Sequence, residues 1–109
     1  MEVTGTVYYL ERMAMPPQAE VHVALIDAST LDAVLRILAE STEPLAERQV
    51  PVAFALPVPE DELEAGTPCA LRAEIRLDGE VQFHTPEPVP VPTALEPVVG
   101  IDIRLYRAT

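Results

Sequence analysis

The sequence is poor in the residues that build covalent or metal-linked scaffolds. It contains one cysteine, Cys69, and it has neither tryptophan nor lysine. A single cysteine cannot form an internal disulfide or a cysteine-rich metal site. No apolar run approaches the roughly 20 residues that a membrane-spanning helix needs. We therefore expect no membrane insertion by this chain.

The amino terminus lacks the pattern of a secretory signal. Residues 1–5 start directly in an apparent strand, without a basic start, an apolar stretch or a small-residue cleavage site. The location stays open at this point. The protein is cytoplasmic if Met1 is the native start, and belongs to the cell envelope or periplasm if a preceding segment is removed.

Basic residues are scarce as well. Seven arginines stand against 18 acidic residues, the net charge is -11, and the arginines are spread along the chain. Nucleic-acid binding depends on a concentrated basic face, so we expect no nucleic-acid partner. An anionic leaflet would repel the acidic surplus. We interpret the acid as a source of solubility, with a patch for a basic partner as the alternative.

Alternation of apolar and polar residues is what the sequence has in abundance. Hydrophobic residues make up 49% of the chain, enough for one domain over residues 1–109 with its own core. Period-two alternation is typical of strands with one buried face. About seven short strands with Pro- or Gly-containing connections predict an all-β, antiparallel β-sandwich. The alternating segments are 3–9, 21–25, 36–42, 50–56, 69–77, 81–83 and 101–105.

The core and the few helical segments follow from the same pattern. Leu71, Ile75 and Phe83 are expected to point inward. The apolar spacing of residues 31–38 would also suit a short helix, although we favour a strand at 36–42 after a loop at 28–34. The convincing helical piece is Pro59 to Glu64, which we expect to make at most one short helical turn.

The turn at Asp78-Gly79 permits a prediction of register. A two-residue loop would pair Leu77 with Glu80 and would set apolar side chains opposite polar ones. We predict a three-residue loop instead, with Gly79 at the left-handed position of a bulge. The resulting pairs are Ile75 with Val81, Ala73 with Phe83 and Arg76 with Glu80.

Residues 86–92 have proline at every second position. All four missing N–H donors can then face one way, which suits an edge strand that resists extension by another chain. A polyproline ligand is the alternative, although the spacing contains no proline at i and i+3. We favour an edge strand or a tethered loop.

No constellation of residues points to catalysis, so we expect no enzyme, no catalytic or metal-binding residues and no cofactor. His22 and His84 could share a metal with Glu20 or Glu74, but nothing in their spacing requires it. Cys69 falls on an inward position and is expected to be an inert buried thiol. The acidic run Glu60 to Glu64 is contiguous and helix-like, unlike a calcium loop.

Six segments of the chain form a recognisable succession of motifs. They are, in order, Val3 to Arg12 (VTGTVYYLER), Met15 to Ala19 (MPPQA), Val21 to Ser29 (VHVALIDAS), Leu38 to Glu40 (LAE), Gln49 to Phe54 (QVPVAF) and Ala70 to Gly79 (ALRAEIRLDG). This order of motifs resembles the YbaY/YscW lipoprotein family. The chain departs from that family in lacking the signal peptide and the lipid-bearing cysteine, and Cys69 stands where the family usually has tyrosine.

The resemblance implies a transthyretin-like β-sandwich without enzymatic activity. Family members are mostly envelope lipoproteins, and one branch acts as pilots or chaperones for the outer-membrane ring of type III secretion. We therefore expect a binding or chaperone-like module with a protein partner. The alternatives are an accessory structural domain or, less favoured, a metal-dependent enzyme. The candidate partner surface is Tyr8, Leu10, Ile26 and Tyr106, on the outward faces of their strands.

Overall fold

The computed structural model describes residues 2–29, 36–62, 67–91 and 98–108, and these residues form strands with a single turn of 3₁₀ helix. No helix in this described part is long and apolar enough to cross a membrane. The all-β prediction is confirmed. The elements are β1 (Glu2–Tyr8), β2 (Glu20–Asp27), β3 (Ile37–Pro44), β4 (Val52–Pro57), η1 (Glu60–Glu62), β5 (Cys69–Leu77), β6 (Glu80–His84), β7 (Val89–Val91), β8 (Val98–Arg104) and β9 (Tyr106–Arg107).

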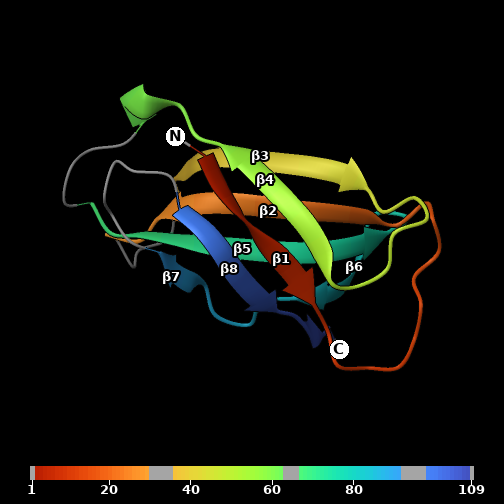
Figure 1. Cartoon of the computed structure of the whole chain (residues 1–109). Coiled ribbons are helices and arrows are strands. Elements are labelled where there is room, and N and C mark those ends of the chain that lie inside the picture. Colours follow the sequence, from red (N-terminus) through yellow and green to blue (C-terminus); the bar gives the residue numbers. More distant parts are fainter. Residues whose placement is uncertain (1, 30–35, 63–66, 92–97, 109) are drawn as a thin grey trace.

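The strands form two sheets that pack face to face, so the predicted sandwich is also confirmed. A three-stranded sheet has the order β4-β1-β8, and a six-stranded sheet has the order β3-β2-β5-β6-β9 with β7 beside β5. Figure 1 shows β1, β4 and β8 crossing over β2 and β5. Two details differ from the prediction. The described residues hold nine strands rather than seven, and β1 pairs with β8 in parallel.

The core lies between the two sheets and is made of the alternating aliphatic side chains. Leu71 and Ile75 are 0% exposed and Phe83 is 1% exposed, as the alternation predicted. Tyr9 continues the inward face of β1 and stacks on Phe83, with their ring centroids 4.1 Å apart. This stack joins the end of β1 to the six-stranded sheet, and aromatic pairs of this kind add to simple burial.

The β5–β6 hairpin differs from the predicted register. Leu77 pairs with Glu80, so the loop has two residues, and Asp78 and Gly79 both have positive φ, at 53° and 82°. That combination suits a tight type I′ turn. The three-residue loop is therefore wrong, and so are the three pairs predicted from it.

A bulge on β6 restores an apolar partner for Ile75, although Leu77 still pairs with Glu80. Ile75 and Arg76 are consecutive, but their partners Phe83 and Val81 are two residues apart, which leaves Gln82 as the extra residue. The bulge returns Phe83 to the core and leaves Val81 facing outward, 37% exposed.

The parallel pairing of β1 and β8 depends on glycine at two positions. Gly100 has a φ of 75° and stands where β8 carries an extra residue between the partners of Val3 and Gly5. A Cβ at Gly5 would lie 1.9 Å from the carbonyl oxygen of Ile101. Only a residue without a side chain fits between these backbones.

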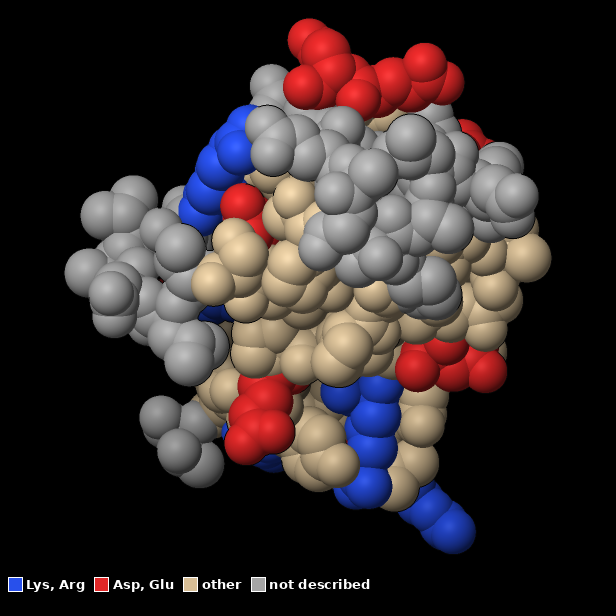
Figure 2. All heavy atoms as spheres, turned by 90° about the vertical axis from the view of Figure 1, so that its left-hand side faces the viewer, with Lys and Arg blue, Asp and Glu red and all other residues tan. Residues whose placement is uncertain are grey.

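Three further sequence predictions concern β3, the acidic run and the proline-rich segment. β3 lies at Ile37–Pro44, close to the predicted strand, while residues 30–35 lie outside the described part. Glu60–Glu62 of the acidic run form the 3₁₀ turn η1, and residues 63 and 64 lie outside the described part. Figure 2 shows acidic side chains gathered at that end of the molecule. β7 pairs with β5 through Val89 and Val91 and is an edge strand, so this part of the proline-rich segment is not a free polyproline ligand.

Candidate functional site

Three of the four predicted surface residues lie near one another at the ends of β1 and β8. Tyr8 is the register partner of Arg104, and the guanidinium carbon of Arg104 lies 4.4 Å from the centre of the Tyr106 ring. Leu10 follows two residues after Tyr8 and is 61% exposed. We call Tyr8, Leu10, Arg104 and Tyr106 the aromatic strip.

The chain reaches this arrangement by changing sheets at Leu105. The Leu105 N–H donates to the carbonyl oxygen of Tyr8 at 2.7 Å, and the Leu105 side chain is fully buried. Beyond it, Tyr106 pairs with His84 in the six-stranded sheet. The crossover thus joins the outer surface of one sheet to the edge of the other.

Two open cavities adjoin the aromatic strip. One, of about 380 Å³, is lined by Tyr8, and there Thr6 Oγ1 donates to Asp102 Oδ1 at 2.8 Å. The other, of about 410 Å³, is lined by Arg104 and Tyr106 together with residues 85–87 and Val89. Both combine apolar and polar groups, as protein and small-molecule binding sites do.

The turn after β1 is held by Tyr9 and Met13. The Tyr9 hydroxyl donates to the carbonyl oxygen of Met13, and Arg107 Nη1 donates to the Met13 sulfur at 3.8 Å. Burial and then the negative charge of Glu11 raise the pKa of the Tyr9 hydroxyl. These contacts fix the segment that presents Leu10.

Ile26, the fourth predicted residue, lies elsewhere. It belongs to β2 and lines a pocket of about 330 Å³ with other outward-facing residues of β2, β3 and β5. Ile26 lies on the outer face of its strand, as the alternation predicted, yet only 2% of the residue is exposed. The structure therefore separates the predicted surface into the aromatic strip and a pocket around Ile26.

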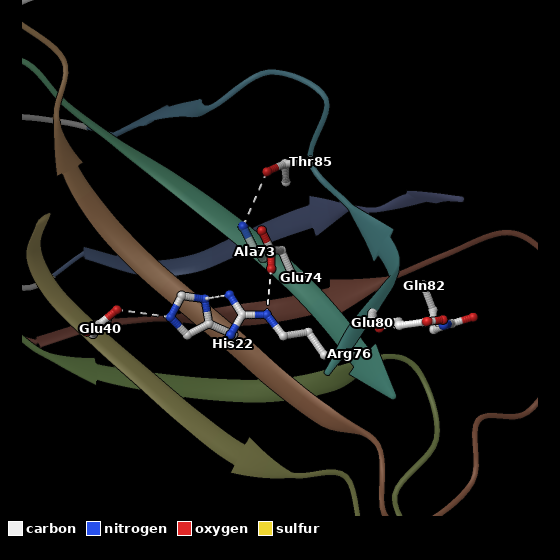
Figure 3. A network of polar contacts seen from close by, with 8 residues as sticks. All are labelled: His22, Glu40, Ala73, Glu74, Arg76, Glu80, Gln82 and Thr85. Atoms are coloured by element: carbon white, nitrogen blue, oxygen red, sulfur yellow. Dashed lines mark hydrogen bonds and ion pairs between the residues drawn. The ribbon is translucent and has the colours of Figure 1, made fainter. Parts of the chain in front are cut away.

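Polar side chains line part of the pocket around Ile26, and Figure 3 shows the contacts between them. Arg76 Nε donates to Glu74 Oε2 at 2.7 Å, and Arg76 Nη2 donates to His22 Nδ1 at 3.4 Å. His22 Nε2 lies 3.1 Å from Glu40 Oε2. A guanidinium only donates and a carboxylate only accepts. His22 Nδ1 is therefore the acceptor toward Arg76, and His22 Nε2 faces the Glu40 carboxylate.

The two histidines face the same way across the sheet. His22 and His84 are both register partners of Glu74, one on each side of β5. Within the described residues, however, no three His, Cys, Asp or Glu side chains are placed to hold a metal ion. Glu74 is engaged by Arg76, and Glu20, the other acid considered in the sequence, pairs with Arg76 in register.

Cys69 is buried at the start of β5, 6% exposed, with its sulfur 3.6 Å from the Thr67 carbonyl oxygen. Burial, and secondarily the negative charge of Asp27, raise the pKa of the Cys69 thiol. A raised pKa keeps the thiol protonated and slow to react, unlike a nucleophile.

The comparisons with known proteins agree with this architecture. The family model described as "Type III secretion system lipoprotein chaperone (YscW)" matches residues 1–101. The chain belongs to the YscW family. The description of this family names a secretion-system lipoprotein chaperone.

Two relatives extend the YscW comparison. The chain is 32% identical over 89 residues to the uncharacterized lipoprotein YbaY of Escherichia coli (strain K12), covering 82% of this chain. It spans about half the length of that relative, 47%. A solved structure, an alternative pilotin from the type II secretion system of Vibrio cholerae, matches with a TM-score of 0.91 and 30% identity over 100% of this chain and 97% of the other.

Proposed function

We propose that this chain is a non-enzymatic, chaperone-like module that holds a segment of a protein partner in the cell envelope. The observation that carries the proposal is the chain-long similarity to a pilotin, with a TM-score of 0.91. Membership of a family described as secretion-system lipoprotein chaperones supports the same class of function.

The aromatic strip is the surface we assign to the partner. Tyr106 is 43% exposed and Leu10 is 61% exposed, so apolar area is available there without unfolding. Tyrosine and arginine are enriched among the residues that dominate binding energy at protein interfaces. The adjoining cavities offer room for the partner's apolar side chains.

The charge of the protein limits which kinds of partner segment it would bind. A net charge of -11 favours approach of a segment that carries basic residues near its apolar ones. Its relatives are described as a secretion-system lipoprotein chaperone and a pilotin, and the partner we favour is a ring-forming subunit of a secretion channel. Its segment would lay apolar side chains along Tyr8 and Tyr106 and leave basic side chains toward the acidic surface.

Site-specific photocrosslinking tests this proposal. A photoreactive phenylalanine analogue replaces Tyr106 in one version of the protein and Glu43 in a control version, since Glu43 is exposed on β3, away from β8 and β9. Both are expressed in the native host and the cell envelope is isolated. We expect a secretion-channel subunit to be crosslinked from position 106 and not from position 43. Equal crosslinking from both positions, or none in the envelope, would overturn the assignment.

A further inference from the structure

The pocket around Ile26 owes its existence to one small side chain on the outer face of the six-stranded sheet. Ala24 pairs with Glu40 on β3 and with Arg72 on β5, so the three form one row across the strands. Longer side chains, His22 and Ile26, lie before and after Ala24 on the same face of β2. The methyl group of Ala24 therefore forms the floor of a hollow of about 330 Å³.

The charged groups of this pocket are paired except for one. Glu74 accepts from Arg76, and Glu40 accepts from His22. Arg72, by contrast, is half-buried and forms no hydrogen bond or ion pair with any residue that the structure describes. A half-buried guanidinium with five unused donors has lost part of its hydration without compensation.

We propose that this pocket binds a short-chain aliphatic monocarboxylate. Arg72 holds the carboxylate with two parallel N–H donors, the geometry for which a guanidinium is suited. The aliphatic chain lies over Ala24 and against Ile26 and Ile37. Ile37 is 50% exposed without a ligand, and the bound chain would cover it.

The pocket selects for one negative charge. Among the described residues that line the pocket, Arg72 is the one cation without a partner, because Arg76 is committed to Glu74 and His22. A phosphate dianion would bring a second charge beside Glu40 and Glu74 with no cation to balance it. Inorganic phosphate is therefore expected not to bind.

The volume limits the length of the chain. About 330 Å³ lies at the lower end of the range for small-molecule sites. A ligand of this size with one charged group is expected to bind weakly, with a Kd on the order of 1 mM. Hexanoate is a suitable probe.

An NMR titration of the full chain with hexanoate tests the proposal. We expect saturable shifts of the Ala24 and Arg72 backbone amides, and no comparable shifts with hexanamide or hexylamine. Equal binding of hexanamide would show that Arg72 does not select the ligand, and would overturn the proposal.

Three variants locate the site, and a fourth serves as the control. R72Q should weaken hexanoate binding by roughly tenfold or more, and R72K should restore part of it, because lysine keeps the charge without the planar fork. A24L fills the hollow from its floor and should abolish binding. R12Q makes the same charge change at an exposed position away from the sheet and should leave the affinity unchanged. If R72Q behaves as R12Q does, the assignment fails.

A further titration with a peptide distinguishes two sources of the carboxylate, namely a small molecule and the carboxyl terminus of a polypeptide. A tetrapeptide ending in leucine is compared with hexanoate, both with a free carboxylate. Comparable or weaker binding of the peptide supports a small-molecule site. Binding more than tenfold tighter would make the pocket a receptor for a chain end and would overturn it. None of these results bears on the aromatic strip, so the proposed function and this inference can fail separately.

Discussion

A few residues with small or buried side chains determine how closely the strands approach and where the surface is hollow. Gly5 allows β8 to approach β1, and Ala24 leaves a hollow on the outer face of the larger sheet. Cys69 fills an inward position at the start of β5 without taking part in chemistry. The amino-acid composition does not reveal the structural role of any of these three residues. Each role depends on the residues that lie next to it in the folded structure.

Replacing Gly5 with alanine should strongly destabilise the protein. The added Cβ would overlap the Ile101 carbonyl oxygen, which belongs to rigid backbone and cannot rotate away. We expect the free energy of unfolding to fall by about 3 kcal/mol, measured by urea denaturation. The control is Gly79→Ala, where space is open and only the positive φ is strained, with an expected loss of about 1 kcal/mol. Equal losses would contradict the close approach of β1 and β8.

Cys69 should make stability depend on alkaline pH. Burial raises the pKa of the thiol in the folded protein, whereas the unfolded thiol titrates near its ordinary value of about 8.5. Above that pH the unfolded chain releases the proton and the folded chain retains it. The free energy of unfolding therefore falls as the pH rises through the unfolded pKa. The difference between wild type and Cys69→Ala from pH 7 to 10 isolates the effect. A difference that does not change with pH would contradict it.

At the scale of the elements, alternation identified strands well and register poorly. The inward positions of β5 and of Phe83 were correct because burial on one face imposes period two. Val81, which the predicted register set inward opposite Ile75, faces outward instead. The predicted hairpin register was wrong because a bulge changes which residues of a strand face inward. No residue around Gln82 indicates a bulge at that position. The positive φ of Asp78 and Gly79 favoured the tight turn, and the bulge then corrected the facing of Phe83.

Deleting Gln82 should therefore be tolerated. The shortened β6 would pair regularly with β5, still setting Phe83 opposite Ile75 and His84 opposite Glu74. The identified loss is the bond from the Ala108 N–H to the Gln82 carbonyl oxygen, so we expect a cost of about 1 kcal/mol. Deleting Ala53 from β4, which has no bulge, would turn the rest of that strand inside out and should prevent folding. Thermal unfolding monitored by circular dichroism compares the two, and similar damage would contradict the bulge.

At the scale of the whole molecule, pairing between distant segments creates the candidate sites. The sequence predicted that Tyr8, Leu10, Ile26 and Tyr106 point outward, and it had no means of grouping them. Their grouping depends on the parallel β1–β8 pair and on the change of sheet at Leu105, two non-local features.

The pocket around Ile26 illustrates the same limit. His22 and Arg76 both stand opposite the inward positions of their alternating segments. Their contact requires the β2–β5 register, which alternation alone does not determine. The unpaired state of Arg72 is likewise a property of its neighbours in space. The sequence gives one hint of an unpaired arginine, because two arginines share the outward face of the strand over residues 69–77.

The most direct test of the proposed function measures how tightly this chain binds the channel-subunit segment that crosslinks at position 106. Isothermal titration would compare wild type, a Tyr8→Ala and Tyr106→Ala double variant, and Arg72→Gln. We expect the double variant to bind at least about 30-fold more weakly, since central aromatic residues contribute about 2 kcal/mol or more, and Arg72→Gln to bind as wild type does. Undiminished binding by the double variant, with its fold intact, would contradict the account.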